Sequence, residues 1–219
     1  MHRFTESFIR YCENVFCFEN EQIENYQSLP ICIIECVYSL RARYDEVTIP
    51  IVERYASYYL NGNKYSSNDT ISKFLNHLEK DGLRFFADNV VKNNQYSGRT
   101  PKVDVCYKLA QYLKCLHIET INDFQKFQSQ ELLNIVVKSV KGIGYAGANY
   151  LFMLAGDESR CKPDVHIHRC IVNACGSDVS DEECQTIFTE AVDILSKQYP
   201  YLTVRKLDRI IWQAYRKKI

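Results

Sequence analysis

Apolar side chains recur along most of this chain at the three- and four-residue intervals of an amphipathic helix. The first such stretch runs from Phe4 to Phe16, with apolar residues at positions 4, 8, 9, 12, 15 and 16. A period near 3.6 residues puts these side chains on one face, which is then buried against other helices. The alternating apolar and polar pattern of a β-strand does not persist anywhere for long. The sequence therefore predicts an all-α fold with roughly ten helices of ordinary length.

Residues that begin and end helices divide this pattern into elements. Proline suits a first turn because the amide hydrogen that it lacks has no partner there, and Ser, Thr and Asp side chains cap helix starts. The expected caps are Ser67 or Asp69, Ser129, Thr203, and Ser180 with Glu183 in a capping box. The expected helices span 4–16, 31–44, 50–60, 71–81, 85–91, 102–116, 130–139, 145–155, 164–174, 181–198 and 204–217, with a short one from 122. Gly176 is expected to close the helix that ends near residue 174.

Composition limits the class of protein without naming a function. The 219 residues are 46% hydrophobic and carry 27 basic and 27 acidic side chains, so any nucleic-acid-binding surface must be local. The N-terminal MHRFTESFIR lacks the apolar run of a signal peptide, and the longest apolar run, 150–155, is too short to span a bilayer. Ten cysteines are scattered through helical patterns, as small apolar residues are. We therefore expect a soluble cytoplasmic monomer with reduced thiols.

The stretch from 140 to 169 reads VKGIGYAGANYLFMLAGDESRCKPDVHIHR and carries the candidate chemistry. Gly142 and Gly144 form a turn between two helical patterns, where glycine permits unusual backbone angles and close approach to a phosphate. A helix that begins at Tyr145 would direct unbonded amides and its positive dipole end at that phosphate, and Lys141 adds charge beside it. A tight turn in a structural protein can have the same Gly-x-Gly, so the turn alone does not establish DNA binding.

The turn and the following KPDVHIHR together resemble the helix-hairpin-helix superfamily of base-excision DNA glycosylases with a Gly/Pro-Asp motif. GIG-x-x-x-ANY is most similar to 3-methyladenine glycosylase II, and PDVHI to the 8-oxoguanine glycosylase and endonuclease III branches. The resemblance covers about thirty residues. It implies a glycosylase that acts on a damaged or modified base in double-stranded DNA. It also implies a helical barrel over 30–155, a second subdomain from 1–29 plus 156–219, and an active-site cleft between them.

The resemblance assigns the catalytic carboxylate to Asp164. Cleavage of an N-glycosidic bond builds positive charge on the sugar, and a carboxylate can stabilise that charge and deprotonate the attacking water. An aspartate at a helix start can also simply cap the helix. The superfamily's lyases carry a nucleophilic lysine at the position of Ala146, so the resemblance implies a monofunctional enzyme that leaves an abasic site. Lys162 is interpreted as a solvated loop lysine.

Further contacts to DNA are expected from several segments. The resemblance matches His166 to a histidine near a DNA phosphate, whereas His168 is interpreted as a packing or surface residue. Arg99, in the loop-like NNQYSGRTP, is a candidate DNA contact, with a solvated connector as the alternative. A flipped base needs an aromatic-lined pocket, for which the candidates are Tyr150, Asp208 and Trp212, with core packing as the alternative for the tryptophan. A basic strip near the C-terminus supports DNA contact: Arg205, Lys206, Arg209, Arg216, Lys217 and Lys218.

No metal or organic cofactor is expected. Two cysteines and two histidines are candidate zinc ligands: Cys161, His166, His168 and Cys170. Their spacing lacks the Cys-x-x-Cys pair that is typical of a structural zinc site. The cysteine spacing also differs from the iron–sulfur pattern of endonuclease III relatives, so no cluster is implied. Binding of a monovalent cation by carbonyl oxygens of the hairpin is the one alternative that we keep. The alternative functions are a non-catalytic helix-hairpin-helix DNA-binding protein and a glycosylase directed at modified bases of foreign DNA.

Overall fold

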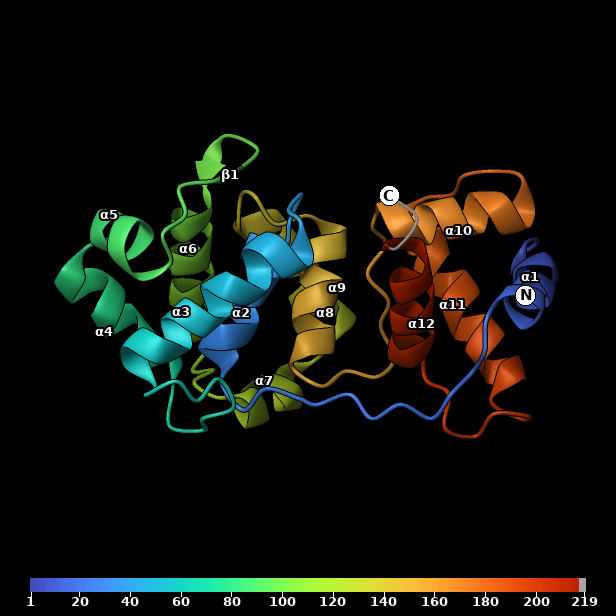
Figure 1. The fold of residues 1–219 in the computed structure, drawn as a ribbon, viewed down its shortest axis with the longest axis horizontal. Coiled ribbons are helices and arrows are strands. Elements are labelled where there is room, and N and C mark those ends of the chain that lie inside the picture. The colour runs from blue at the N-terminus through green and yellow to red at the C-terminus, as the bar shows by residue number, and fades with distance from the viewer. Residues whose placement is uncertain (217–219) are drawn as a thin grey trace. The chain divides into compact units, whose positions relative to one another are not determined.

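The computed structural model of the chain describes residues 1–216, and this part is predominantly helical (Figure 1). The coarse prediction of an all-α fold is confirmed. The α-helices are α1 (Thr5–Val15), α2 (Leu29–Tyr38), α3 (Ile49–Tyr59), α4 (Ile71–Asp81), α5 (Leu83–Phe85), α6 (Lys102–Cys115), α7 (Ile121–Phe127), α8 (Gln130–Ser139), α9 (Tyr145–Leu154), α10 (Val165–Cys175), α11 (Asp181–Leu195) and α12 (Val204–Arg216). Two π-helices and a pair of short strands complete them: η1 (Tyr44–Thr48), η2 (Phe86–Val90), β1 (Tyr96–Ser97) and β2 (Thr100–Pro101).

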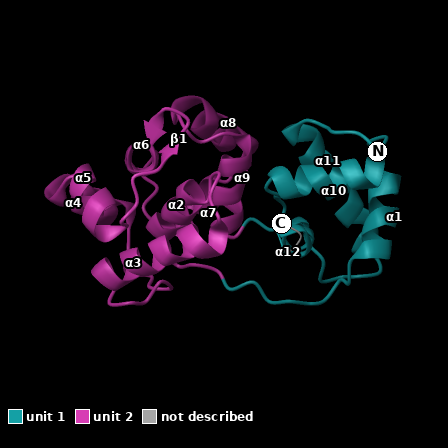
Figure 2. Ribbon diagram, turned by 45° about the horizontal axis from the view of Figure 1, so that its top comes forward, with its two compact units in different colours: residues 1–24, 157–219 teal, residues 25–156 magenta. Residues whose placement is uncertain are grey.

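The chain divides into two compact units (Figure 2). Unit 1 consists of residues 1–24 together with the chain from 157 onward, and unit 2 consists of residues 25–156. Each unit has a hydrophobic core of its own. The sequence-based division places the corresponding boundaries at 29/30 and 155/156. Lys217 and Lys218, assigned to the last helix and the basic strip, lie outside the described residues.

Helix α2 forms the centre of unit 2. All ten of its residues are buried, and it contacts α3, α6 and α9. Its sequence LPICIIECVY is apolar on nearly every side, which is typical of a helix that is enclosed by others. Pro30 occupies the first turn as predicted, and the Ser28 hydroxyl caps it by accepting the Ile31 amide hydrogen at 3.1 Å.

The prediction that this helix continues to residue 44 is wrong. It ends at Tyr38, and Arg41 has a left-handed backbone φ of 53°. The fully buried Lys102 of α6 stabilises this end, because its Nζ donates to the carbonyl oxygens of Tyr38 at 3.1 Å and Leu40 at 2.8 Å. Carbonyls at a helix end have no partner within the helix, so a cation there satisfies them. Lys102 lies more than 60 positions away in the sequence, so no local pattern predicts this end.

Other predicted boundaries had mixed outcomes. Ser129 caps α8, Ser180 and Glu183 form the capping box of α11, Gly176 ends α10 with φ 70°, and Thr203 accepts an amide hydrogen from the first turn of α12, all as predicted. The predicted helix over 85–91 is a short α-helix followed by the π-helix η2. Neither Ser67 nor Asp69 caps α4, since Thr70 does. Asp69 is instead buried and accepts hydrogen bonds from Ser28 and Tyr55.

The loop-like segment before α6 contains an antiparallel pair of two-residue strands that was not predicted. Tyr96 pairs with Pro101 and Ser97 with Thr100, around a turn in which Gly98 has φ 61°. The Ser97 hydroxyl donates to the Gly142 carbonyl oxygen at 2.6 Å. This bond fastens the strand pair to the turn between α8 and α9.

Unit 1 packs α1, α10, α11 and α12 around an apolar core. The amphipathic first helix buries Phe8 and Cys12, as its periodicity predicts, and Phe8 lies against Phe188 of α11 with ring centroids 5.0 Å apart.

Within residues 1–216, none of the helices combines the length and the apolar character needed to cross a bilayer.

Candidate functional site

Asp164 is the N-cap of α10. Its Oδ1 accepts the amide hydrogens of His166 at 2.9 Å and Ile167 at 3.3 Å. The structure therefore shows Asp164 in the capping role that the sequence offered as the alternative to catalysis. Both bonds use Oδ1 and neither uses Oδ2, so the cap orients the carboxylate and leaves its second oxygen outside that interaction. A capping role and a catalytic one are thus compatible for the same residue.

The loop before Asp164 is held by neighbouring helices of unit 1. Glu158 accepts from the Arg205 side chain at 3.0 Å, and its carbonyl accepts the Arg205 amide hydrogen at 3.1 Å. The Cys161 amide hydrogen is bound by Gln185 of α11 at 3.0 Å. Because bonds from α11 and α12 restrain the loop at several points, the position of Asp164 depends on the packing of these helices.

Asp208 of α12 is a second acid beside Asp164. Its side chain is buried, with 7% exposed, and its Oδ1 accepts the Lys162 amide hydrogen at 2.8 Å. Burial, followed by the negative charge of Asp164, raises the pKa of Asp208 to about 8. Asp208 therefore holds its proton at pH 7. Two neighbouring acids in different environments are an arrangement that enzymes use to separate acid and base roles.

Trp212 follows Asp208 by one helical turn and is partly exposed, outside the buried core of unit 1. Its ring lies edge-on to the His166 ring, with centroids 6.4 Å apart and planes at 90°. The Arg216 guanidinium lies 4.4 Å from the tryptophan ring centroid, within the range of a cation–π contact. The His166 Nδ1 is buried and has no hydrogen-bond partner among the described residues.

Unit 1 thus brings together predicted residues from two distant stretches of sequence. The start of α10 supplies Asp164 and His166, and α12 supplies Asp208 and Trp212. The cluster combines an oriented carboxylate, a protonated acid and a partly exposed aromatic ring. In this part of the molecule, and in the rest of residues 1–216, no group of three or more His, Cys, Asp or Glu side chains is arranged to hold a metal ion.

His168, interpreted from the sequence as a packing or surface residue, forms two ion pairs. Its Nδ1 lies 2.8 Å from Asp178 and its Nε2 lies 3.0 Å from Asp181. Burial lowers the pKa of His168, but the hydrogen bonds and charges of the two aspartates outweigh it, so that this pKa is raised above 6.5. The same contact lowers the pKa of Asp178. The imidazole therefore joins α10 to the loop before α11, most strongly when it is protonated.

A His168→Gln variant is expected to be less stable than the wild type at pH 5.5 and nearly as stable at pH 8.5. The pKa is raised in the folded state, so its contribution is present at low pH and is lost as the pH rises through that value. Because the pair is partly exposed, the loss at pH 5.5 should be about 0.5–1 kcal/mol. Urea unfolding followed by Trp212 fluorescence measures it. His117→Asn, at an exposed histidine of unit 2, is the control and should show no such dependence. An equal loss at both pH values would contradict the ion-pair argument.

The turn between α8 and α9 requires glycine at one position and not at the other. Gly142 has φ 101°, and a Cβ there would lie 2.7 Å from a methyl carbon of Val105. Gly144 has ordinary extended angles, and a Cβ there would meet nothing within 4 Å. The expectation that both glycines adopt angles forbidden to other residues is therefore wrong for Gly144. Ile143, between them, is buried. The exposed Gly144 leaves the start of α9 open, where Tyr145 and Ala146 form the first turn.

This turn is joined to two other loops at the same end of unit 2 (Figure 1). Ser97 links it to the strand pair, and Lys102 links the strand pair to the loop after α2, because its Nζ bonds both Gln95 and Leu40. Exposed basic side chains lie on these loops and beside them: Arg41, Arg43, Lys92, Arg99, Lys138 and Lys141. The predicted Arg99 and Lys141 belong to this group, whereas Arg41 was missed because its loop joins the group only through long-range contacts.

Tyr150, predicted for the base pocket, lies inside unit 2 on α9. Its hydroxyl donates to Oε1 of the buried Glu35 at 2.5 Å. Sequence reasoning missed Glu35, although a single acid within the apolar run ICIIECVY was a signal.

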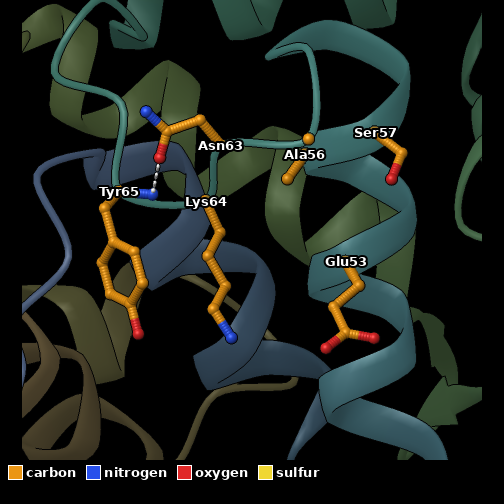
Figure 3. A pocket seen from close by; sticks show the side chains of 7 residues that line it. Glu53, Ala56, Ser57, Asn63, Lys64 and Tyr65 are labelled. Carbon is orange, nitrogen blue, oxygen red and sulfur yellow. Dashed lines mark hydrogen bonds between the residues drawn. The ribbon is translucent and has the colours of Figure 1, made fainter.

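A shallow pocket of about 400 Å³ lies elsewhere in unit 2, on α3 and the loop that follows it (Figure 3). Glu53 and Lys64 reach toward the same space, with the Tyr65 ring beside the lysine. The Tyr65 amide is fixed by a hydrogen bond to Asn63 at 3.0 Å. No residue that the sequence singled out lines this pocket, and its lining is mostly exposed.

A profile of the family described as "Domain of unknown function (DUF8548)" matches residues 8–216. The matched range includes residues of both units, so the hairpin, Asp164 and α12 all lie within the family's domain. Searches among curated proteins and among solved structures found no match.

Proposed function

The chain belongs to the DUF8548 family, whose description assigns no activity, and from its own residues we propose that it is a monofunctional DNA glycosylase. It hydrolyses the N-glycosidic bond of a damaged or modified base in double-stranded DNA and leaves an abasic site. The observation that carries the proposal is the cluster of Asp164, His166, Asp208 and Trp212, which follows the Gly-x-Gly hairpin by one helix.

In this reaction Asp164 is the catalytic carboxylate. The α10 amides hold Oδ1, and Oδ2 faces the sugar, where it stabilises the positive charge that develops as the bond to the base breaks. The carboxylate then takes a proton from the attacking water. Asp208, protonated at pH 7, adds no second negative charge beside it. The partly exposed Trp212 ring supplies a surface on which a base can stack.

Unit 2 contributes the DNA-binding surface. The open start of α9 offers backbone amides to a phosphate next to Lys141, and the helix dipole favours an anion there. The exposed side chains of Arg99 and Arg41 extend the positive charge over the neighbouring loops. This local charge accounts for DNA binding by a chain whose total charge is zero.

Borohydride is expected to trap no covalent complex between the enzyme and DNA. Trapping needs an amine that attacks the sugar, and Ala146 stands where the superfamily's lyases have lysine. The amide hydrogen of the nearby Lys162 is bound to Asp208. The measurement is gel electrophoresis of enzyme and abasic DNA after reduction. Efficient trapping that disappears in Lys162→Gln would contradict monofunctional chemistry and assign lyase activity to Lys162.

The proposal is tested with duplex oligonucleotides that carry alkylated, oxidised, deaminated or hypermodified bases. Incubation followed by hot alkali should cleave at least one substrate at the modified base. Cleavage confined to the hypermodified arm would indicate action on foreign DNA. If every duplex is bound but none yields an abasic site, the protein is a non-catalytic DNA-binding protein and the proposal is wrong.

A further inference from the structure

Glu35 is an acid enclosed in the apolar centre of unit 2. Its side chain is 1% exposed on α2. Oε1 accepts two hydrogen bonds, from the hydroxyls of Tyr44 at 2.8 Å and Tyr150 at 2.5 Å. Oε2 is buried and has no hydrogen-bond partner among residues 1–216. A buried acceptor without a donor is costly, so an oxygen left in this state points to a ligand that supplies one.

The surroundings of Glu35 are aromatic. Tyr44 and Tyr150 bring rings from η1 and α9, and Tyr26 stacks on Tyr65 with ring centroids 5.6 Å apart and planes at 27°. Burial, followed by the negative charge of Glu35, raises the pKa values of Tyr26 and Tyr150 far above 10. Both phenols therefore keep their protons, and the Tyr150 hydroxyl donates to Oε1 of the carboxylate. A free acceptor oxygen on a carboxylate that two tyrosines contact matches a flat ligand that carries an N–H group.

Resting on the proposed function, we propose that Glu35, Tyr44 and Tyr150 form the site that recognises the excised base. Oε2 accepts an N–H of the base, from an exocyclic amino group or a protonated ring nitrogen, while the two hydroxyls hold Oε1 and fix the carboxylate plane. Tyr150 lies on the helix that begins at the hairpin. Tyr150 follows Gly144 by six positions, a rise of about 9 Å along that helix, so α9 joins the phosphate contact to base recognition.

Access to Oε2 requires a side chain to move. Tyr44 and Tyr150 are on helical segments, whereas Tyr26 lies in a stretch without regular secondary structure that precedes α2. Displacement of Tyr26 breaks no helical hydrogen bond and is therefore the least costly way to open the site. The substrate class follows from the acceptor. The site takes bases that present an N–H donor and rejects those in which alkylation has removed every donor from the edge facing Oε2.

The test is binding of free bases to the full-length protein without DNA. The probes are 3-methyladenine, hypoxanthine, 8-oxoguanine, uracil and 5-hydroxymethylcytosine, with 6-dimethylamino-9-methylpurine, which has no N–H, as the negative probe. Isothermal titration calorimetry should detect binding of at least one base and none of the negative probe. Glu35→Gln places an amide donor toward the base and should weaken that binding at least about tenfold. The matched control is Glu53→Gln, at an exposed glutamate of α3, which should bind as the wild type does.

Further measurements separate the possible failures. If Glu35→Gln does not fold, Tyr44→Phe removes one hydroxyl from Oε1 while keeping the ring and should weaken binding in the same direction. Base binding that depends on Glu35, together with no cleavage of any oligonucleotide, would reject the glycosylase proposal and retain the base site. Two outcomes would overturn the base site and leave the glycosylase proposal standing. In the first, the wild type excises a base from DNA but binds no free base. In the second, Glu35→Gln and Tyr44→Phe bind the free base as the wild type does.

Discussion

Replacement of Asp164 with Asn is expected to reduce base excision by about a thousandfold or more while leaving the fold unchanged. An amide cannot stabilise the developing positive charge on the sugar, nor can it take a proton from water. Asparagine caps helices about as well as aspartate, so its Oδ1 should still accept the amide hydrogens of His166 and Ile167. Loss of activity without loss of stability therefore separates catalysis from capping.

The measurement is the single-turnover excision rate on whichever duplex the wild type cleaves, together with a thermal unfolding curve. Asp193→Asn, at an exposed position of α11, is the matched control and should cleave at the wild-type rate. Asp164→Ala should additionally lower the free energy of unfolding by about 1 kcal/mol, because alanine cannot cap. Excision by Asp164→Asn at the wild-type rate would leave Asp164 with a capping role only and would remove the proposed mechanism.

Replacement of Lys102 with Met should give the largest loss of stability, about 2–4 kcal/mol in the free energy of unfolding of unit 2. The hydrogen bonds of Nζ to Tyr38, Leu40 and Gln95 would be lost, and the carbonyl oxygens of Tyr38 and Leu40 would be left without this donor at the buried end of α2. Methionine fills much of the space that the lysine stem occupies, so the effect reports mainly the lost donors.

Circular dichroism is the appropriate probe for this variant. Trp212, the sole tryptophan, lies in unit 1, so its fluorescence would follow the other unit. Lys108→Met, at an exposed lysine of the same helix, is the control and should change the stability by less than about 0.5 kcal/mol. A Lys102→Met protein that unfolds at the wild-type denaturant concentration would show that the carbonyls at the end of α2 find other partners.

Most helices follow from the amino-acid pattern because helix formation and capping are local. Apolar residues three and four apart define a face, and the side chains of Ser129, Ser180 and Glu183 bond amides within the next turn. In two of the wrong predictions, a residue distant in the sequence determines the outcome. α2 ends at Tyr38 beside Lys102, and Asp69 bonds Ser28 and Tyr55 in place of capping α4.

The candidate site likewise has one part that the sequence identified and another that only the packing of the helices created. The motif in the sequence singled out Asp164 and the hairpin glycines, since their spacing along the chain carries the chemical signal. The contact between Asp208 and the loop of Lys162 spans 46 residues, and that between Glu35 and Tyr150 spans 115. Burial and neighbouring charge, which set the protonation of Asp208 and leave one oxygen of Glu35 without a donor, arise only when helices pack. The order of residues thus decided the helices and the motif, and three-dimensional packing decided which acids lie together and how each is charged.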